Sequence, residues 1–397
     1  GGMRYRRHID GLRAVAILPV VGYHLDLPLF SGGFTGVDIF FVISGFLITS
    51  MIVSDLDTRQ FSIMDFYRRR ALRILPAYVA MIAAVIAAAW FLMLPEEALS
   101  LGRTVIAASI FASNFYFWKV TGYFNPGVED EPLIHTWTLS TEEQFYLVLP
   151  WVLILIAGVL RRRYGSAILV LAIASFGLSV AGLSYGPTGT FYLLPTRAWE
   201  FGLGGLAAIW SFETRVTSRL SRNLLSLLGL GLIGYGILAL GPESPFPGVN
   251  ALFPVVGAVL LISMADGTVT GNVLSTRPVV AIGRISYSLY LWHWPIIVFY
   301  KIAVGPQLSV AQIVMLAAVS VMVAGLSYRF IEQPFRTQRM RTRPAIRVNL
   351  VALVSILATV GAGIAVVRNA SDWGAYPAEV RRVSSYMDYR ENMAIHP

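Results

Sequence analysis

Two side chains that could move a proton or hold an anion stand in the first apolar segment of the chain, where ionisable groups are costly. In RAVAILPVVGYHLD, residues 13–26, Arg13 is followed by His24 eleven residues later. On a helix this spacing corresponds to about 16 Å, and Pro19 between them is expected to kink the helix. His24 could be a general base in the middle or outer half of a bilayer, with Arg13 at its inner mouth. A core histidine with a satisfied hydrogen bond is an equally favoured interpretation.

A second polar pair lies in GGFTGVDIFFVISGFLI, residues 32–48. Asp38 and Ser44 are six residues apart, so they face different sides of a helix. Asp38 could hold the imidazolium of His24 during catalysis, or it could orient a neighbouring helix, which is at least as well supported. The glycines of this segment indicate close helix packing.

An arginine cluster precedes the next apolar run, in DFYRRRALRILPAY, residues 65–78. Arg70 and Arg73 are three residues apart, so on a helix they share a face and could clamp an anion together. Anchoring at the cytoplasmic face alone would explain Arg68 and Arg69.

Carboxylates and aromatic rings gather in LIHTWTLSTEEQFYLVLPW, residues 133–151. Hydrogen bonds to carboxylates and stacking on rings are what a sugar site needs, and helix capping explains only one of the glutamates comfortably. The candidate acceptor-binding residues are His135, Trp137, Glu142, Glu143 and Tyr146.

Three further patches are candidates for lining a pore. Arg197 and Glu200 are three apart and predict an ion pair. In ISYSLYLWHWP, Pro295 is expected to break the helix after the histidine. The other candidates are Tyr287, Tyr290 and His293 in that segment, and Glu332 between Arg329 and Arg336. Ser44 of the second apolar segment is a pore candidate as well.

The composition sets the class of protein in which these residues must be placed. Of 397 residues, 56% are hydrophobic and 13% are charged, and the mean hydropathy is +0.66, which indicates an integral membrane protein. The net charge of +9 comes from arginines in short loops, which set topology and do not form a nucleic-acid surface. Without cysteine, disulfides, thiolate metal sites and a cysteine nucleophile are excluded, and no metal site is predicted.

Apolar runs long enough to cross a bilayer predict an all-α fold of ten plus one transmembrane helices around a central pore or cavity. Residues 103–118 are less apolar and are expected to lie in the interface or to re-enter from one side. The arginines then fall on one side, which places the N-terminus in the cytoplasm and the C-terminus in the periplasm. The predicted spans are 12–30, 35–54, 74–94, 143–160, 166–184, 195–211, 223–240, 249–265, 282–302, 311–331 and 347–367.

The ordered motifs resemble the membrane-bound acyltransferase-3 family, which includes bacterial O-antigen and peptidoglycan O-acetyltransferases. They are HIDGLRAVAI, GVDIFFVISGFLI, FYRRRALRILPAY, WTLSTEEQFY, RAWEFGLGG, SYSLYLWHWP and SYRFIEQPF, and they cover residues 7 to about 335. The resemblance implies a bacterial inner-membrane enzyme that transfers an acyl group, usually acetyl, from cytoplasmic acyl-CoA to a carbohydrate hydroxyl outside, such as lipopolysaccharide O-antigen. It also implies that Arg13, His24, Arg70 and Arg73 matter most, and that acetyl-CoA is a substrate and no cofactor is permanently bound.

By the same resemblance, the chain divides into four parts. Residues 1–335 form the acyltransferase-3 transmembrane domain, residues 336–346 a basic cytoplasmic loop, and residues 347–367 an extra transmembrane helix. Residues 368–397 are expected to be a periplasmic linker or the start of an SGNH-type domain, which could also be a separate partner.

Two other classes of function fit parts of the sequence. In a proton-coupled transporter or flippase, the buried ionisable residues would relay protons and no bond would be made. A membrane anchor for an outer domain would explain the eleventh span but not the polar residues in the other ten. Release of free thiol from acetyl-CoA distinguishes the enzyme from the transporter.

Overall fold

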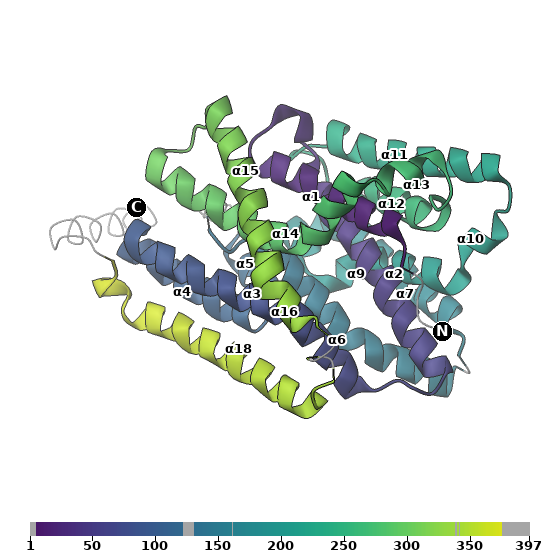
Figure 1. Ribbon diagram of the computed structural model, residues 1–397, viewed down its shortest axis with the longest axis horizontal. Coiled ribbons are helices and arrows are strands. Elements are labelled where there is room, and N and C mark those ends of the chain that lie inside the picture. Colours follow the sequence, from purple (N-terminus) through teal and green to yellow (C-terminus); the bar gives the residue numbers. More distant parts are fainter. Residues whose placement is uncertain (1–4, 122–130, 161, 338–339, 341, 375–397) are drawn as a thin grey trace. The chain divides into compact units, whose positions relative to one another are not determined.

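The computed structural model describes residues 5–121, 131–160, 162–337, 340 and 342–374, and these residues form helices and no strand. This agrees with the predicted all-α fold. Figure 1 shows the helices coloured along the chain.

The chain divides into two compact units, residues 1–63 with 141–290 and residues 64–140 with 291–397. Their boundaries fall at the start of α3 (Ile63–Leu92) and inside α6 (Thr136–Val159) and α14 (Arg277–Val304). The other α-helices of the first unit are α1 (Arg7–His24), α2 (Gly36–Asp57), α7 (Tyr164–Tyr185), α8 (Pro187–Tyr192), α9 (Leu194–Trp210), α10 (Phe212–Arg215), α11 (Arg219–Ala239), α12 (Leu252–Met264) and α13 (Val269–Leu274). The second unit contains α4 (Pro95–Ser109), α5 (Ser113–Val120), α15 (Val310–Ser327), the π-helical turn η5 (Tyr328–Glu332), α16 (Gln333–Phe335) and α18 (Ala345–Arg368).

Seven helices of the described part are long and apolar enough to cross a membrane. They are Gly33–Asp57, Ile63–Leu92, Thr136–Val159, Tyr164–Tyr185, Arg219–Ala239, Val310–Phe335 and Ala345–Arg368. Each coincides with a predicted span, and the other four predicted spans fall on α1, α9, α12 and α14. The helices therefore support a multi-pass membrane protein.

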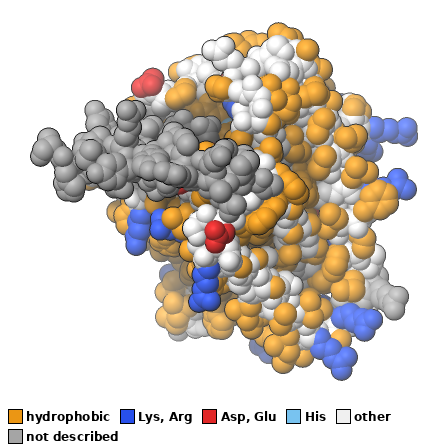
Figure 2. All heavy atoms as spheres, turned by 90° about the vertical axis from the view of Figure 1, so that its left-hand side faces the viewer, with side chains coloured by type: hydrophobic (Ala, Val, Ile, Leu, Met, Phe, Trp, Pro, Cys, Tyr) orange, Lys and Arg blue, Asp and Glu red, His pale blue; other side chains and the backbone are white. Residues whose placement is uncertain are grey.

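Large apolar side chains are exposed along these helices. Leu155 on α6 is 63% exposed, Val170 on α7 is 65% exposed and Val351 on α18 is 66% exposed. On the face seen in Figure 2, hydrophobic side chains cover most of the described surface. Because water would not stabilise such continuous apolar surface, it is suited to contact with lipid.

In the first unit, α2 and α9 pack backbone against backbone. A Cβ atom on Gly45 would lie 2.0 Å from the carbonyl oxygen of Phe201, and one on Gly204 would lie 2.1 Å from that of Val42. Only glycine leaves room for this approach. The close packing predicted from the glycines of the second span is confirmed, and it brings charged residues of the two helices together.

In the second unit, α18 runs beside α4 (Figure 1). Just beyond α18, the indole Nε1 of Trp373 donates a hydrogen bond of 3.1 Å to the carbonyl of Ala89. The ring of Trp373 also meets that of Trp90 edge to face. The last described helix is thus packed into this unit and is not a detached anchor.

The first helix differs in its bounds from the predicted span 12–30. It begins at Arg7 and ends at His24, because Asp26 adopts a left-handed conformation with φ of 56° and Pro28 follows. The helix runs through Pro19 without interruption. His24 is therefore the last residue of a helix about 27 Å long.

The third helix begins at Ile63, eleven residues before the predicted start at 74. The arginine cluster therefore lies on the helix and not in a loop. The segment 103–118 forms parts of two helices, α4 and α5, separated where Phe111 has a φ of 53°.

Pro295 does not end its helix, contrary to the prediction. Helix α14 continues through it from Arg277 to Val304. A proline removes one hydrogen-bond donor, and membrane helices tolerate this loss when neighbouring groups satisfy the freed carbonyl.

The predicted C-terminal parts are described only partly. Residues 338, 339 and 341 of the basic loop, and residues 375–397 of the expected linker or SGNH-type domain, lie outside the described residues. Helix α18 occupies Ala345–Arg368, where the extra span 347–367 was predicted.

Candidate active site

Helix α1 carries the two residues that the sequence places first, Arg13 and His24. The guanidinium Nη1 of Arg13 lies 3.2 Å from Oδ1 of Asp10, and Oδ2 of the same carboxylate accepts a 2.6 Å hydrogen bond from the hydroxyl of Tyr5. His24 is half-buried at the end of the helix, with its ring 5.5 Å from that of Tyr23. One continuous helix therefore carries both the guanidinium and the imidazole.

A buried charge cluster connects α2 to α9. Nη2 of Arg197 lies 3.2 Å from Oδ1 of Asp38, and Nε lies 3.0 Å from Oε1 of Glu200. All three side chains are at most 1% exposed. The predicted Arg197–Glu200 pair is confirmed. The described partner of Asp38 is this arginine, which favours the orienting role over a contact with His24.

Aromatic rings enclose the guanidinium of this cluster. Its carbon lies 5.5 Å from the ring centre of Phe41, 5.8 Å from that of Phe191 and 5.5 Å from that of Phe246. Rings at this distance stabilise a desolvated cation. The cluster is therefore built to hold helices together.

A second cluster joins Ser44 on α2 to Glu142 and Tyr146 on α6. The hydroxyl of Ser44 donates a hydrogen bond to the carboxylate of Glu142. The phenol of Tyr146 donates to the same carboxylate, and it lies 3.0 Å from Oγ of Ser44. The predicted pore residue and two predicted acceptor residues thus meet at one carboxylate. Such a group can bind hydroxyls or accept a proton from one.

The remaining acceptor candidates are distributed over both units. Glu143 lies beside Glu142 on α6. Trp137 and His135 belong to the second unit and are buried. Nε2 of His135 is 3.1 Å from the carbonyl oxygen of Leu291, and its ring lies 6.0 Å from that of His293. Burial, reinforced by the nearby His293, lowers the pKa of His135, so this imidazole is neutral at pH 7.

The other pore candidates have structural neighbours. Tyr290 meets Phe40 edge to face at 6.5 Å, while Tyr287 lies one turn earlier on α14. Glu332 is buried in the π-helical turn, and its Oε1 accepts a 2.6 Å hydrogen bond from Nη1 of Arg336. Their part in a pore stays a prediction.

Arg70 and Arg73 lie three residues apart on α3 and are half-buried. They belong to the second unit, whereas His24 belongs to the first. A common role of these arginines and the histidine therefore stays a prediction.

The sequence interpretation missed Glu131, which is 8% exposed. Its Oε2 accepts a 3.0 Å hydrogen bond from Ser100, and its backbone carbonyl accepts one of 2.9 Å from the indole of Trp294. Burial raises the pKa of Glu131 to about 7, against the opposing effect of hydrogen bonds from Ser100 and Thr104. The long, weakly periodic segment 95–142 gave no signal that this residue would be buried.

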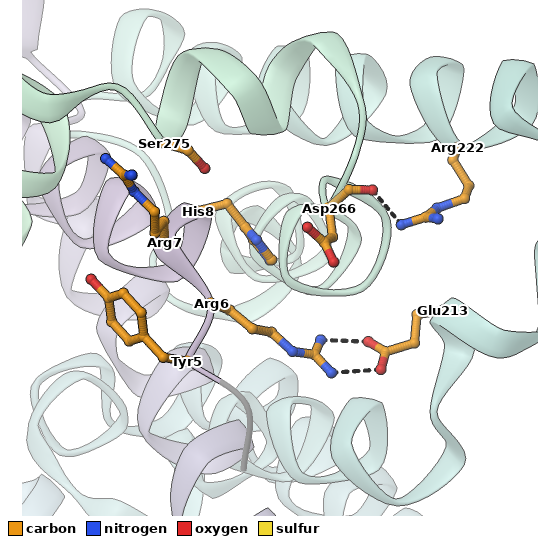
Figure 3. Close-up of a pocket in the computed structure, with 8 residues that line it drawn as sticks. All are labelled: Tyr5, Arg6, Arg7, His8, Glu213, Arg222, Asp266 and Ser275. Carbon is orange, nitrogen blue, oxygen red and sulfur yellow. Dashed lines mark hydrogen bonds and ion pairs between the residues drawn. The ribbon is translucent and has the colours of Figure 1, made fainter.

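The sequence interpretation also missed a cavity of about 510 Å³ at the N-terminal end of α1. In Figure 3 the side chains of Arg6 and Glu213 point toward one another and that of Arg222 points toward Asp266, while the side chain of Arg7 extends to the other side, where Ser275 lies. The charged side chains of the lining come from the start of α1 and the residue before it, from α10 and α11, and from the segment after α12. They are Arg6, Arg7, Glu213, Arg222 and Asp266, and the other lining residues are Tyr5, His8 and Ser275. Only the short basic stretch before the first span could have indicated it.

Among the described residues, no group of three or more histidine or acidic side chains could hold a metal ion.

Comparison with known proteins identifies the family. The acyltransferase-domain family matches residues 6–329. The O-acetyltransferase OatA of Staphylococcus aureus (strain NCTC 8325 / PS 47) is 33% identical over 348 residues, which are 84% of this chain and 57% of that protein. The "Putative peptidoglycan O-acetyltransferase YrhL" of Bacillus subtilis (strain 168) is 33% identical over 366 residues, covering 85% of this chain and 56% of YrhL.

This chain thus spans little more than half the length of these relatives. No solved structure matches it. The match to residues 6–329 covers the charged and hydroxyl-rich clusters on α1, α2, α6 and α9. The chain therefore belongs to the membrane-bound acyltransferase-3 family.

Proposed function

We propose that this chain is the membrane part of an O-acetyltransferase. It takes an acetyl group from acyl-CoA in the cytoplasm and delivers it to a carbohydrate hydroxyl on the periplasmic side of the inner membrane. The observation that carries the proposal is that Arg13 and His24 share one helix of membrane length in a chain of this family. In this proposal Arg13 serves the donor side and His24 the acceptor side, and α1 connects the two.

The acceptor is a cell-surface glycan. The name of YrhL refers to peptidoglycan, which favours a cell-wall polymer, and lipopolysaccharide O-antigen is the alternative acceptor. The Ser44–Glu142–Tyr146 cluster suits either one, because a carboxylate flanked by two hydroxyls can accept hydrogen bonds from a sugar. Glu143, Trp137 and His135 are proposed to extend this acceptor site.

The donor is proposed to bind through arginines. Arg70 and Arg73 share one face of α3 and would bind phosphates of coenzyme A by charge-assisted hydrogen bonds, together with Arg13. The pantetheine arm would then carry the thioester toward His24. Ten plus one spans around a central cavity, with a cytoplasmic N-terminus and a periplasmic C-terminus, complete the proposal.

In the transfer step, His24 accepts the proton of the sugar hydroxyl as its oxygen attacks the thioester carbonyl. The carbon–sulfur bond breaks, and the leaving thiolate takes the proton from the imidazolium, so acetyl ester and free coenzyme A result. In a second form of the proposal, a ring nitrogen of His24 attacks the thioester first, the carbon–sulfur bond breaks, and coenzyme A leaves as its thiol with the proton of the ring. The sugar hydroxyl then attacks the acyl-histidine, the bond from the acyl carbon to nitrogen breaks, and the hydroxyl proton returns to the imidazole. An SGNH-type domain, fused or separate, is a proposed partner on the far side.

The test uses the full chain in liposomes supplied with acetyl-CoA and a glycan acceptor. Wild-type protein should release free thiol and form acetyl ester, and His24→Ala should lose both activities by at least a hundredfold. Leu18→Ala, on the exposed face of the same helix, is the matched control and should keep both.

Full acetyl transfer by His24→Ala would overturn the role of this histidine. Passage of a glycolipid through the membrane without thiol release would instead support the transporter.

A further inference from the structure

The cavity at the N-terminal end of α1 is rich in positive charge. Its lining has three arginines against two carboxylates, and the guanidinium of Arg6 is already paired with Glu213 through both of its terminal nitrogens. Figure 3 shows this pair on one wall of the cavity. Within the described chain, the side chain of Arg7 has no ion pair, so its charge is available to a ligand.

Backbone groups add to this positive potential. Helix α1 begins at Arg7, and the side chain of its N-cap residue, Arg6, makes no capping hydrogen bond. The free N–H groups of a helix start, together with guanidinium groups, are well suited to phosphate oxygens. A volume of about 510 Å³ is in the range of sites for nucleotide-sized ligands.

Arg222 is held in place from the opposite wall. Its guanidinium donates a hydrogen bond to the backbone carbonyl of Asp266, and its buried Nε has no hydrogen-bond partner within the described chain. The carboxylate of Asp266 lines the same cavity. This carboxylate would repel an anion. Replacing it by a neutral residue should therefore tighten the binding of an anion.

The cavity is connected to the candidate active site through one side chain. Tyr5 lines the cavity, and its hydroxyl donates to Asp10, the carboxylate that also pairs with Arg13. Arg284 lies over the ring of Tyr5, and its Nη2 donates a 3.1 Å hydrogen bond to the hydroxyl. A ligand in the cavity can therefore influence the position of Arg13.

We propose that this cavity binds the phosphate groups of a ligand through Arg7, Arg222 and the start of α1, and that the acyl-CoA donor supplies them. This assignment of the donor rests on the proposed function. Coenzyme A carries a diphosphate and a separate 3′-phosphate, and guanidinium groups can bind either one by charge-assisted hydrogen bonds. An anionic lipid headgroup has the same phosphate chemistry and is the competing source.

The test measures binding of coenzyme A, and of pantetheine, which lacks all phosphates, to the full chain in detergent by calorimetry. Arg7→Gln and Arg222→Gln should each weaken coenzyme A binding at least tenfold and leave pantetheine binding unchanged. Asp266→Asn should tighten coenzyme A binding several-fold, a gain that misfolding cannot produce. Arg219→Gln, on α11 but outside the cavity lining, is the matched control and should bind like the wild type.

Equal affinity of all these variants for coenzyme A would overturn the proposal. Native mass spectrometry with phosphatidylglycerol tests the other source. If Arg7→Gln and Arg222→Gln lose bound lipid and keep wild-type affinity for coenzyme A, the donor assignment is wrong.

Thiol release separates this inference from the proposed function. Cavity-dependent binding of coenzyme A without thiol release from acetyl-CoA would contradict the proposed function and leave the phosphate site standing. Normal thiol release with unaltered binding by the variants would contradict only the phosphate site.

Discussion

At the scale of single residues, the chain separates polar groups that pair with one another from polar groups that could meet a substrate. Arg197, Asp38 and Glu200 form a buried cluster of charges. Ser44, Glu142 and Tyr146 share hydrogen bonds around one half-buried carboxylate. The second cluster is the better candidate for binding sugar hydroxyls, because the carboxylate of Glu142 is only half-buried and makes no ion pair within the described part of the chain.

Tyr146→Phe removes one hydrogen-bond donor from this cluster. If the cluster binds the acceptor, KM for the glycan should rise about tenfold, the usual effect of losing one such hydrogen bond, and the Kd of coenzyme A should stay the same. Steady-state kinetics in liposomes measure the first and calorimetry measures the second. Tyr235→Phe, at an exposed tyrosine of α11, is the control. A lower Tm with unchanged KM would assign Tyr146 a structural role alone.

Glu131 should make stability depend on pH. Its pKa is about 7 in the folded protein and about 4.3 in an unfolded chain, so the folded state binds more protons between these values. Stability should therefore fall as pH rises from about 4.5 to 7 and then stay level. Glu131→Gln should raise the Tm at pH 8 and leave it nearly unchanged at pH 4. Glu96→Gln, on α4, is the control, and equal effects of Glu131→Gln at both pH values would contradict the prediction.

At the scale of elements, tight contact between helices is the main structural feature. The spacing of Arg197 and Glu200 was enough to predict their pairing, because neighbours three apart on a helix are fixed by local geometry. The bond from Arg197 to Asp38 could not be predicted, since these residues are 159 positions apart. The same holds for Ser44 and Glu142, which come from different helices. Hydrophobic runs predicted where the helices lie, and seven of these helices are long and apolar enough to cross a membrane. Helix ends differ from the predicted ends by up to eleven residues, because polar first turns carry no apolar signal.

Gly45→Ala should loosen the contact of α2 with α9. The added Cβ would lie 2.0 Å from a backbone oxygen, and such overpacking costs about 1–3 kcal/mol. Gly231→Ala in α11 has no atom within 4 Å of the new Cβ and should be neutral or slightly stabilising. Thermal unfolding in detergent compares the two variants. Equal Tm values would show that the helices can move apart to make room for the added methyl group with no loss of stability.

Removing one of the buried charges between these helices should lower the stability of the protein more than removing all three together. Arg197→Gln leaves Asp38 and Glu200 without their cation and should cost about 3–5 kcal/mol. Replacing all three residues by leucine should restore most of the stability, because the buried charges are then removed together. Denaturation and thiol release are measured on each variant. A stable but inactive triple variant would show that the reaction needs this charge cluster for more than stability.

At the scale of the whole chain, the distribution of arginines predicts which loops face the cytoplasm. Thr217 lies near Arg215 and Arg219, while Glu243 lies in a loop almost free of positive charge, and both are exposed. The natural absence of cysteine makes single-cysteine variants simple to label. In intact cells, a membrane-impermeant maleimide should label Glu243→Cys at once and Thr217→Cys only after permeabilisation. The reverse pattern would invert the proposed topology and place the cavity at α1 on the outer side.

The π-helical turn at Tyr328–Glu332 has a consequence for how the chain tolerates insertions and deletions. A π turn holds more residues per turn than the α-helix that precedes it, so loss of one residue there could be absorbed as a regular α-helical turn. The residues beyond would then keep about their present orientation relative to α15, whereas loss of one residue from α15 itself would rotate them by about 100°. In that second case Glu332, now buried, would turn with Arg336 toward another side. The π turn is therefore the place where this helix is expected to accept a deletion of one residue.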